Sequence, residues 1–111
     1  MEDWDKIPHL RARDERRSRA PHPAEELLLI TKVSEEANEA AELYRRMRGW
    51  GTNGATTATR RQVQHELCAA ITAGMVALDR ISPDGTARQV WAEYLDYGYT
   101  RAEQENTATG G

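Results

Sequence analysis

Glutamates are concentrated in one short stretch of the chain. Four of the eight residues 35–42 are of this type: Glu35, Glu36, Glu39 and Glu42. On a helix, where successive residues turn by about 100°, Glu36 lies within the apolar sector and Glu39 at its edge. Glu35 and Glu42 lie outside that sector. An inward carboxylate has to be paired, metal-bound or protonated, so the inward pair is the part of this cluster that could do chemistry.

A further carboxylate, Glu66, stands at the start of an uncharged run of twelve residues, 67–78. On a helix it is in line with small residues only: Ala70, Ala73 and Ala77. Small residues let a facing helix or a ligand come close. Glu66 is therefore either a boundary residue beside an alanine-packed seam or a third carboxylate facing Glu36 and Glu39.

Three such carboxylates suit a divalent cation. Mg²⁺ prefers octahedral oxygen ligation and is typically held by few carboxylates together with waters and substrate phosphates. It polarises a phosphoryl oxygen and helps to generate hydroxide. Lys32, one turn before Glu36, would neutralise that residue as an i,i+4 pair, but one lysine does not comfortably satisfy two inward carboxylates.

The elements that would position these residues are helices. The first begins at Pro23 or Ala24 and ends at Arg48, with Gly49 suited to the position after its end. The glycine-rich loop 49–58 separates it from a second helix, which begins at Thr59 or Arg60 and ends at Ile81 before Ser82-Pro83. A third helix is expected over 87–103. No strand-like alternation of any length occurs, so the predicted class is all-α, an antiparallel helical bundle spanning residues 23–103.

The two ends of the chain differ from this bundle. Residues 1–22 are predicted to form a charged arm, flexible or partner-dependent, in which Trp4, Ile7 and Leu10 have the spacing of one short helix. Its arginine-rich stretch, 11–19, is either solvated or a phosphate-contacting arm. Residues 104–111 are predicted to be a disordered tail.

Composition excludes several classes of function. There are 15 basic and 18 acidic residues, a net charge of −3, so no binding of duplex nucleic acid is expected. The single cysteine, Cys68, excludes an intrachain disulfide and a cysteine-based zinc site. No apolar run approaches the roughly 20 residues of a membrane span, and the N-terminal segment has no secretory apolar region. We therefore expect a cytoplasmic protein with no membrane partner.

The predicted core is thin. Leu, Ile, Val and Phe together supply 16 residues of 111, and alanine supplies as many. So few large aliphatic residues make a weak core for one isolated domain. We expect closely packed alanine-rich helices whose core is completed by oligomerisation, as a homodimer or a tetramer.

Residues 32–43 (KVSEEANEAAEL) and 65–81 (HELCAAITAGMVALDRI) resemble the MazG-like all-α nucleoside triphosphate pyrophosphohydrolases. That superfamily carries E-E-x-x-E on one helix and E-x-x-D on the next. The first motif is intact from Glu35 to Glu39, and the second begins at Glu66 after a gap of 26 residues. The resemblance covers residues 24–82.

The resemblance implies a specific reaction. A nucleoside triphosphate would be hydrolysed to the monophosphate and pyrophosphate by attack of water on the α-phosphorus, with Mg²⁺ or Mn²⁺ as cofactor. The implied metal ligands are Glu36, Glu39 and Glu66, and Glu35 would assist by orienting water or by linking to the metal. Lys32 would approach the phosphates and Asp79 the nucleotide. Trp50, in the glycine-rich loop, is either a base-stacking residue or part of the core.

The sequence departs from the family pattern at one ligand. Ala69 stands where the second motif has Asp, and alanine cannot bind a metal. The chain is an engineered inactive variant, a natural member without turnover, or an enzyme that recruits another acid, Asp79 or Asp84. The alternative to an enzyme is a non-catalytic helical module that binds nucleotides or a protein, with Glu36 and Glu39 paired to arginines of a neighbouring helix.

Overall fold

The computed structural model describes residues 1–18 and 24–108. Four helices make up the described chain: α1 (Asp3–Arg17), α2 (Ala24–Arg48), α3 (Arg60–Ile81) and α4 (Ala87–Ala108). No strand occurs among the described residues, which confirms the all-α class. None of these helices combines the length and the apolar character needed to cross a membrane.

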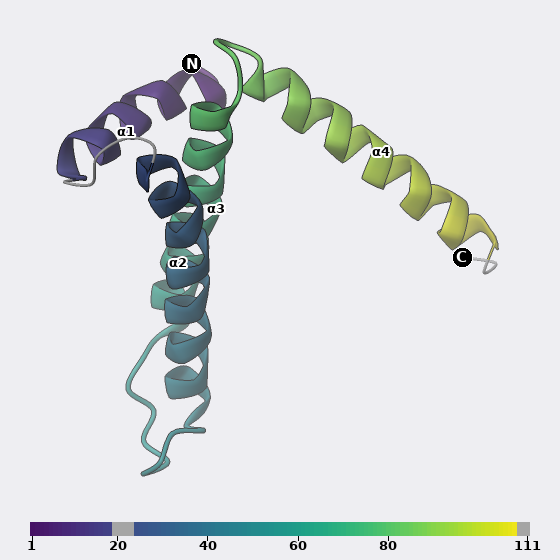
Figure 1. The fold of residues 1–111 in the computed structure, drawn as a ribbon. Coiled ribbons are helices and arrows are strands. Elements are labelled where there is room, and N and C mark those ends of the chain that lie inside the picture. Colours follow the sequence, from purple (N-terminus) through teal and green to yellow (C-terminus); the bar gives the residue numbers. More distant parts are fainter. Residues whose placement is uncertain (19–23, 109–111) are drawn as a thin grey trace.

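Helices α2 and α3 form an antiparallel hairpin, the longest feature of the molecule (Figure 1). Both begin and end where the sequence predicts. At the start of α3, the Thr59 hydroxyl accepts from the Gln62 backbone N–H at 3.1 Å, and the Gln62 side chain accepts from the Thr59 backbone N–H at 2.8 Å. This reciprocal pair satisfies two N–H groups that a helix end leaves open.

The loop between α2 and α3 is held against the end of α2. The Arg46 guanidinium donates to the hydroxyl and the carbonyl of Thr57, at 2.9 and 3.2 Å. Gly49 turns the chain with φ +74°, and a Cβ added there would lie 2.9 Å from the carbonyl oxygen of Gly54. Both the backbone angle and the space therefore require glycine at position 49.

Replacing Gly49 by Ala is expected to reduce the free energy of unfolding by about 1–2 kcal/mol, because alanine is disfavoured in the left-handed region. Thermal denaturation would show a fall in Tm of about 5–10 °C. Gly51→Ala is the control, since no atom lies within 4 Å of a Cβ at Gly51. An equal loss in both variants would contradict this account of the turn.

Helix α1 packs against α3 and the start of α2. The core cluster joins the three helices through Ile7, Leu29, Val76 and Ala77, with Trp4, Leu10 and Met75 packed against it. Arg80 of α3 binds Glu15 of α1 and two carboxylates of α2, Glu25 at 3.3 Å and Glu26 at 3.4 Å. One largely buried guanidinium thus connects all three helices.

Much of the segment expected to be a flexible or partner-dependent arm, 1–22, is therefore a helix on the core. Its residues 3–17 are α1, whereas residues 19–22 lie outside the described residues. Two arginines of the arginine-rich stretch are paired with carboxylates: Arg11 with Glu15 and Asp79, and Arg13 with Asp14. One of these partners, Asp79, is distant in the sequence, so the local pattern could not reveal that the segment is held on the core.

Helix α4 leads away from the hairpin (Figure 1). Ala87 is buried at its first position and is the only buried residue of this helix, all of which is described. The helix ends at Ala108, five residues later than predicted, because residues 104–108 (QENTA) contain no helix breaker. Of the tail predicted over 104–111, residues 109–111 lie outside the described residues.

Candidate metal centre

The hairpin brings together the three carboxylates expected to bind a metal. Glu36 and Glu39 project from α2 and Glu66 from α3, and one oxygen from each lies within 4.8 Å of the other two. Buried alanines on both helices, Ala40 and Ala73, let α2 and α3 approach closely along this seam. Glu36 and Glu66 are half-buried and Glu39 is exposed, so the cluster opens to solvent on one side.

The environment raises the pKa of Glu66 to about 7 from its ordinary value of 4.5. The largest cause is a side-chain hydrogen bond with Glu36, which requires that one of the two carboxyls carries a proton. Desolvation and repulsion from the charges of Glu36 and Glu39 act in the same direction. Three carboxylates this close cannot all be ionised at neutral pH without a positive partner.

No basic side chain of the described residues supplies that partner. The Oε2 atom of Glu66 is enclosed by the protein and has no hydrogen-bond donor among them. Two oxygens bound to one Mg²⁺ at about 2.1 Å lie at most about 4.2 Å apart, so the observed cluster needs only small side-chain rotations to bind an ion. An all-oxygen donor set, an enclosed acceptor without a donor and excess negative charge fit a hard divalent cation.

The fourth ligand position of the family pattern is Ala69. It is half-buried on α3 and lies three residues after Glu66, on the same side of the helix. Its methyl group offers no ligand. Within the described chain, the group of converging acidic residues therefore contains only Glu36, Glu39 and Glu66.

Two other residues implied by the family pattern lie apart from this cluster. Glu35 is exposed and is not among the converging carboxylates. The ammonium of Lys32 lies 3.6 Å from a carboxylate oxygen of Asp14, a buried residue of α1. Asp14 also accepts from Arg13 at 3.2 Å. Sequence reasoning did not identify Asp14, since nothing in a charged stretch marks one acid as buried.

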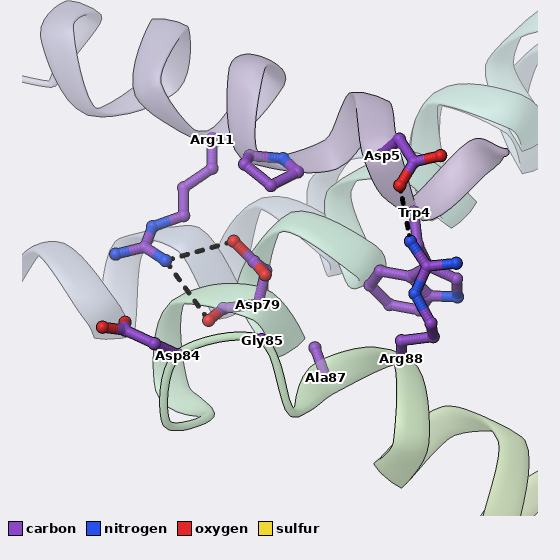
Figure 2. Close-up of a pocket in the computed structure, with 9 residues that line it drawn as sticks. Trp4, Asp5, Arg11, Asp79, Asp84, Gly85, Ala87 and Arg88 are labelled. Carbon is purple, nitrogen blue, oxygen red and sulfur yellow. Dashed lines mark hydrogen bonds and ion pairs between the residues drawn. The ribbon is translucent and has the colours of Figure 1, made fainter. Parts of the chain in front are cut away.

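Asp79 lies at the other end of α3 from the carboxylates. It follows Glu66 by 13 residues, which corresponds to about 20 Å along a helix. Figure 2 shows Arg11 donating to the Asp79 carboxylate, at 3.1 Å, and to its backbone carbonyl. Asp84 lines the same small pocket of about 360 Å³. Neither acid supplies the ligand missing at Ala69.

Trp50 lies in the loop that connects α2 to α3, at the closed end of the hairpin. The residue is 61% exposed, and its ring meets Tyr44 edge-to-face, with the ring centroids 5.7 Å apart. The Arg48 guanidinium lies 5.3 Å from the same ring. Trp50 is therefore an exposed aromatic residue outside the core, and the structure does not place it beside the carboxylates.

Comparison of the chain with family models, with curated proteins and with solved structures found no match. The assignment of a function therefore depends on the geometry of the carboxylate cluster together with the sequence motifs.

Proposed function

We propose that this protein is a Mg²⁺-dependent nucleoside triphosphate pyrophosphohydrolase of the MazG-like type, with activity weakened by Ala69. The observation that carries the proposal is the convergence of Glu36, Glu39 and Glu66 around an enclosed oxygen without a donor. Nucleoside triphosphate is the proposed substrate, Mg²⁺ or Mn²⁺ the proposed cofactor, and the cytoplasm the proposed compartment.

In this proposal the ion would be held from two helices, by Glu36 and Glu39 of α2 and by Glu66 of α3. When bound, the ion would polarise a phosphoryl oxygen and lower the pKa of a coordinated water. Glu35, the exposed neighbour of Glu36 in the sequence, would orient the attacking water from outside the cluster. Lys32 contacts the phosphates by leaving Asp14, which keeps Arg13 as a partner at 3.2 Å.

Metal binding is the first test. We expect Mn²⁺ to bind, measured from the loss of the free-ion signal in electron paramagnetic resonance, and Glu36→Gln to weaken binding at least tenfold. Glu42→Gln is the matched control, because Glu42 lies on the same helix but is exposed and paired with Arg45 at 3.0 Å. Equal binding by both variants would contradict a metal site in this seam.

The same binding depends on pH, because the ligand carboxyls must be ionised. The pKa of Glu66, about 7, means that the metal has to displace a proton at lower pH. Mn²⁺ affinity is therefore expected to increase from pH 5.5 to pH 7 and to level off above that. An affinity that is flat over this range would show that Glu66 is not a ligand.

A nucleotide-binding protein without turnover is the second candidate, and Ala69 is the observation that favours it. Calorimetric titration with Mg²⁺ and a non-hydrolysable triphosphate, followed by measurement of pyrophosphate release, separates the two candidates. Binding with no release from this chain or from Ala69→Asp would favour the second. If neither version binds nucleotide, both proposals fail.

A further inference from the structure

The arginines around the α2–α3 loop form a positively charged region at the closed end of the hairpin, opposite α1 (Figure 1). Residues 43–65, here called the basic tip, contain five arginines and no acidic residue. The basic tip therefore carries +5, whereas the rest of the chain, with 10 basic and 18 acidic residues, carries −8. Asp79 follows Arg60 by 19 residues, about 28 Å along α3, and charges in 0.1 M salt act over only about 10 Å. The basic tip can thus attract an anionic partner although the whole chain is acidic.

Two arginines of the basic tip stand where the helix dipole disfavours them. Arg60 and Arg61 begin α3, whose first turn contains no acidic residue. The amino end of a helix carries a partial positive charge, so cations placed there reduce its stability. Both side chains are exposed, and in the part of the chain that the structure describes neither pairs with a carboxylate. The three arginines in the last turn of α2 are favoured by its dipole, but folding does not explain Arg60 and Arg61.

Aromatic rings lie among these arginines. Trp50 is 61% and Tyr44 38% exposed, and the two rings meet edge-to-face. The Arg48 guanidinium lies 5.3 Å from the centroid of the Trp50 ring. The Trp50 backbone N–H donates to the Arg45 carbonyl at 2.9 Å, which holds this residue at the end of α2. The basic tip therefore presents an exposed aromatic ring in a fixed place, with positive charge on both sides of the loop.

This combination of groups favours one kind of partner. A single strand of nucleic acid offers phosphates that arginines neutralise and bases whose open faces stack on aromatic rings. A duplex keeps its base faces within its own stack, so the expectation that no duplex is bound stands. RNA is the nucleic acid that ordinarily presents single-stranded loops and ends with unstacked bases. An acidic peptide or an anionic membrane would meet the arginines but would leave the ring without a base to stack on it.

We propose that the basic tip binds single-stranded RNA, with a base stacked on Trp50 and the phosphates on Arg48, Arg60 and Arg61. The other two arginines of the tip have partners within the chain. Arg46 binds Thr57 and so holds the loop against α2, and Arg45 pairs with a carboxylate of the preceding turn. None of the three carboxylates of the candidate metal centre belongs to the basic tip, so this binding is a function separate from the proposed hydrolysis.

Fluorescence anisotropy of a labelled oligouridylate of about 12 nucleotides, titrated with the full chain in a chelator, tests this binding. We expect a dissociation constant of about 1–100 μM at about 50 mM salt, and a slope of log affinity against log salt of about −2, for three phosphate contacts. Oligodeoxythymidylate of the same length should bind no more tightly. No binding of oligouridylate, tighter binding of the DNA strand, or tighter binding of phosphatidylglycerol vesicles would each overturn the proposal. Displacement of the strand by a nucleoside triphosphate at equal phosphate concentration would also overturn it.

Removing the two arginines of α3 separates binding from folding. The double variant Arg60→Gln, Arg61→Gln should weaken RNA binding at least tenfold and make the salt slope shallower by about 1.4. Its Tm should be unchanged or higher, because the change removes positive charge from the amino end of α3. The matched control is Arg16→Gln with Arg17→Gln, two exposed arginines at the end of α1, which should bind RNA as the starting chain does. An equal loss of binding in both double variants would mean that net charge, and not the basic tip, governs binding.

Replacing the tryptophan tests the stacking contact. Trp50→Ala should weaken RNA binding at least fivefold with the salt slope unchanged, because it removes a stacked base and no phosphate contact. Trp50→Phe, which keeps a ring, should retain most of the affinity. Tyr97→Ala is the control, since Tyr97 on α4 is as exposed as Trp50, at 61%. Equal affinity of Trp50→Ala and the starting chain would exclude stacking. Because RNA binding is measured without divalent ions, this proposal and the pyrophosphohydrolase proposal can fail independently.

Discussion

Ala69→Asp is expected to raise the rate of pyrophosphate release from nucleoside triphosphates by about 10–100-fold or more. Loss of a residue that merely orients a metal ligand typically costs that much in affinity or activity, and a direct ligand should matter at least as much. Position 69 follows Glu66 on the same side of α3, so a carboxylate there joins the three that already converge.

The measurement compares pyrophosphate release from a panel of ribo- and deoxyribonucleoside triphosphates, with Mg²⁺ and with Mn²⁺. Cys68→Asp, at an exposed position of α3 that faces away from Glu66, is the matched control for added charge. An equal gain in both variants would mean that negative charge on α3, and not a ligand at position 69, causes the change. No release from the starting chain and Ala69→Asp, with either ion, would remove the enzyme proposal.

Glu66→Gln is expected to have opposite effects on the metal-free and metal-bound protein. Without divalent ions, the variant should be more stable at pH 8, because the native state no longer contains an ionised carboxylate repelled by Glu36 and Glu39. With Mn²⁺ present, the starting chain should gain stability and the variant should not, since only the former binds the ion.

The raised pKa of Glu66 determines how the stability of the native state changes with pH. Glu66 has a folded pKa of about 7, above its ordinary value of 4.5. Between these values the unfolded chain loses its proton while the folded chain keeps it, so native stability falls as pH rises. The Tm difference between Glu66→Gln and the starting chain should therefore grow from pH 4.5 to pH 7 and be constant above pH 7.

Thermal denaturation in a chelator, repeated across this pH range, measures the difference. Glu42→Gln again serves as the control, because Glu42 lies on the same helix but is exposed and paired with Arg45 outside the cluster. A difference that shrinks as pH rises would contradict the raised pKa of Glu66.

The hairpin and its carboxylates were predictable because their signals are local. Proline and glycine positions, together with the Thr59 cap, set the bounds of α2 and α3. The helical repeat places Glu36 within the apolar sector of the helix and Glu35 outside it. In the structure Glu36 is half-buried and Glu35 is exposed, as this placement predicts. Glu36 and Glu39 converge with Glu66 because α2 and α3 are antiparallel neighbours joined by a single loop.

The surroundings of the hairpin were not predictable because they depend on contacts between distant residues. Lys32 is paired with Asp14, and Asp79 with Arg11, across more than one helix. Both were expected to contact nucleotide, and no spacing rule identifies the arginine or carboxylate that binds them instead. The docking of α1 rests on the same kind of contact, as Arg80 with Glu15 shows.

Helix α4 has Ala87 as its only buried residue, so little of its order comes from packing within the chain. A solvated helix of this length is marginal by itself in water. We therefore expect the backbone amides of α4 beyond its first turn to exchange hydrogen faster than those of the α2–α3 hairpin. Whatever covers the exposed face of α4 would slow that exchange, so the exchange rate of this helix reports on whether the face is covered.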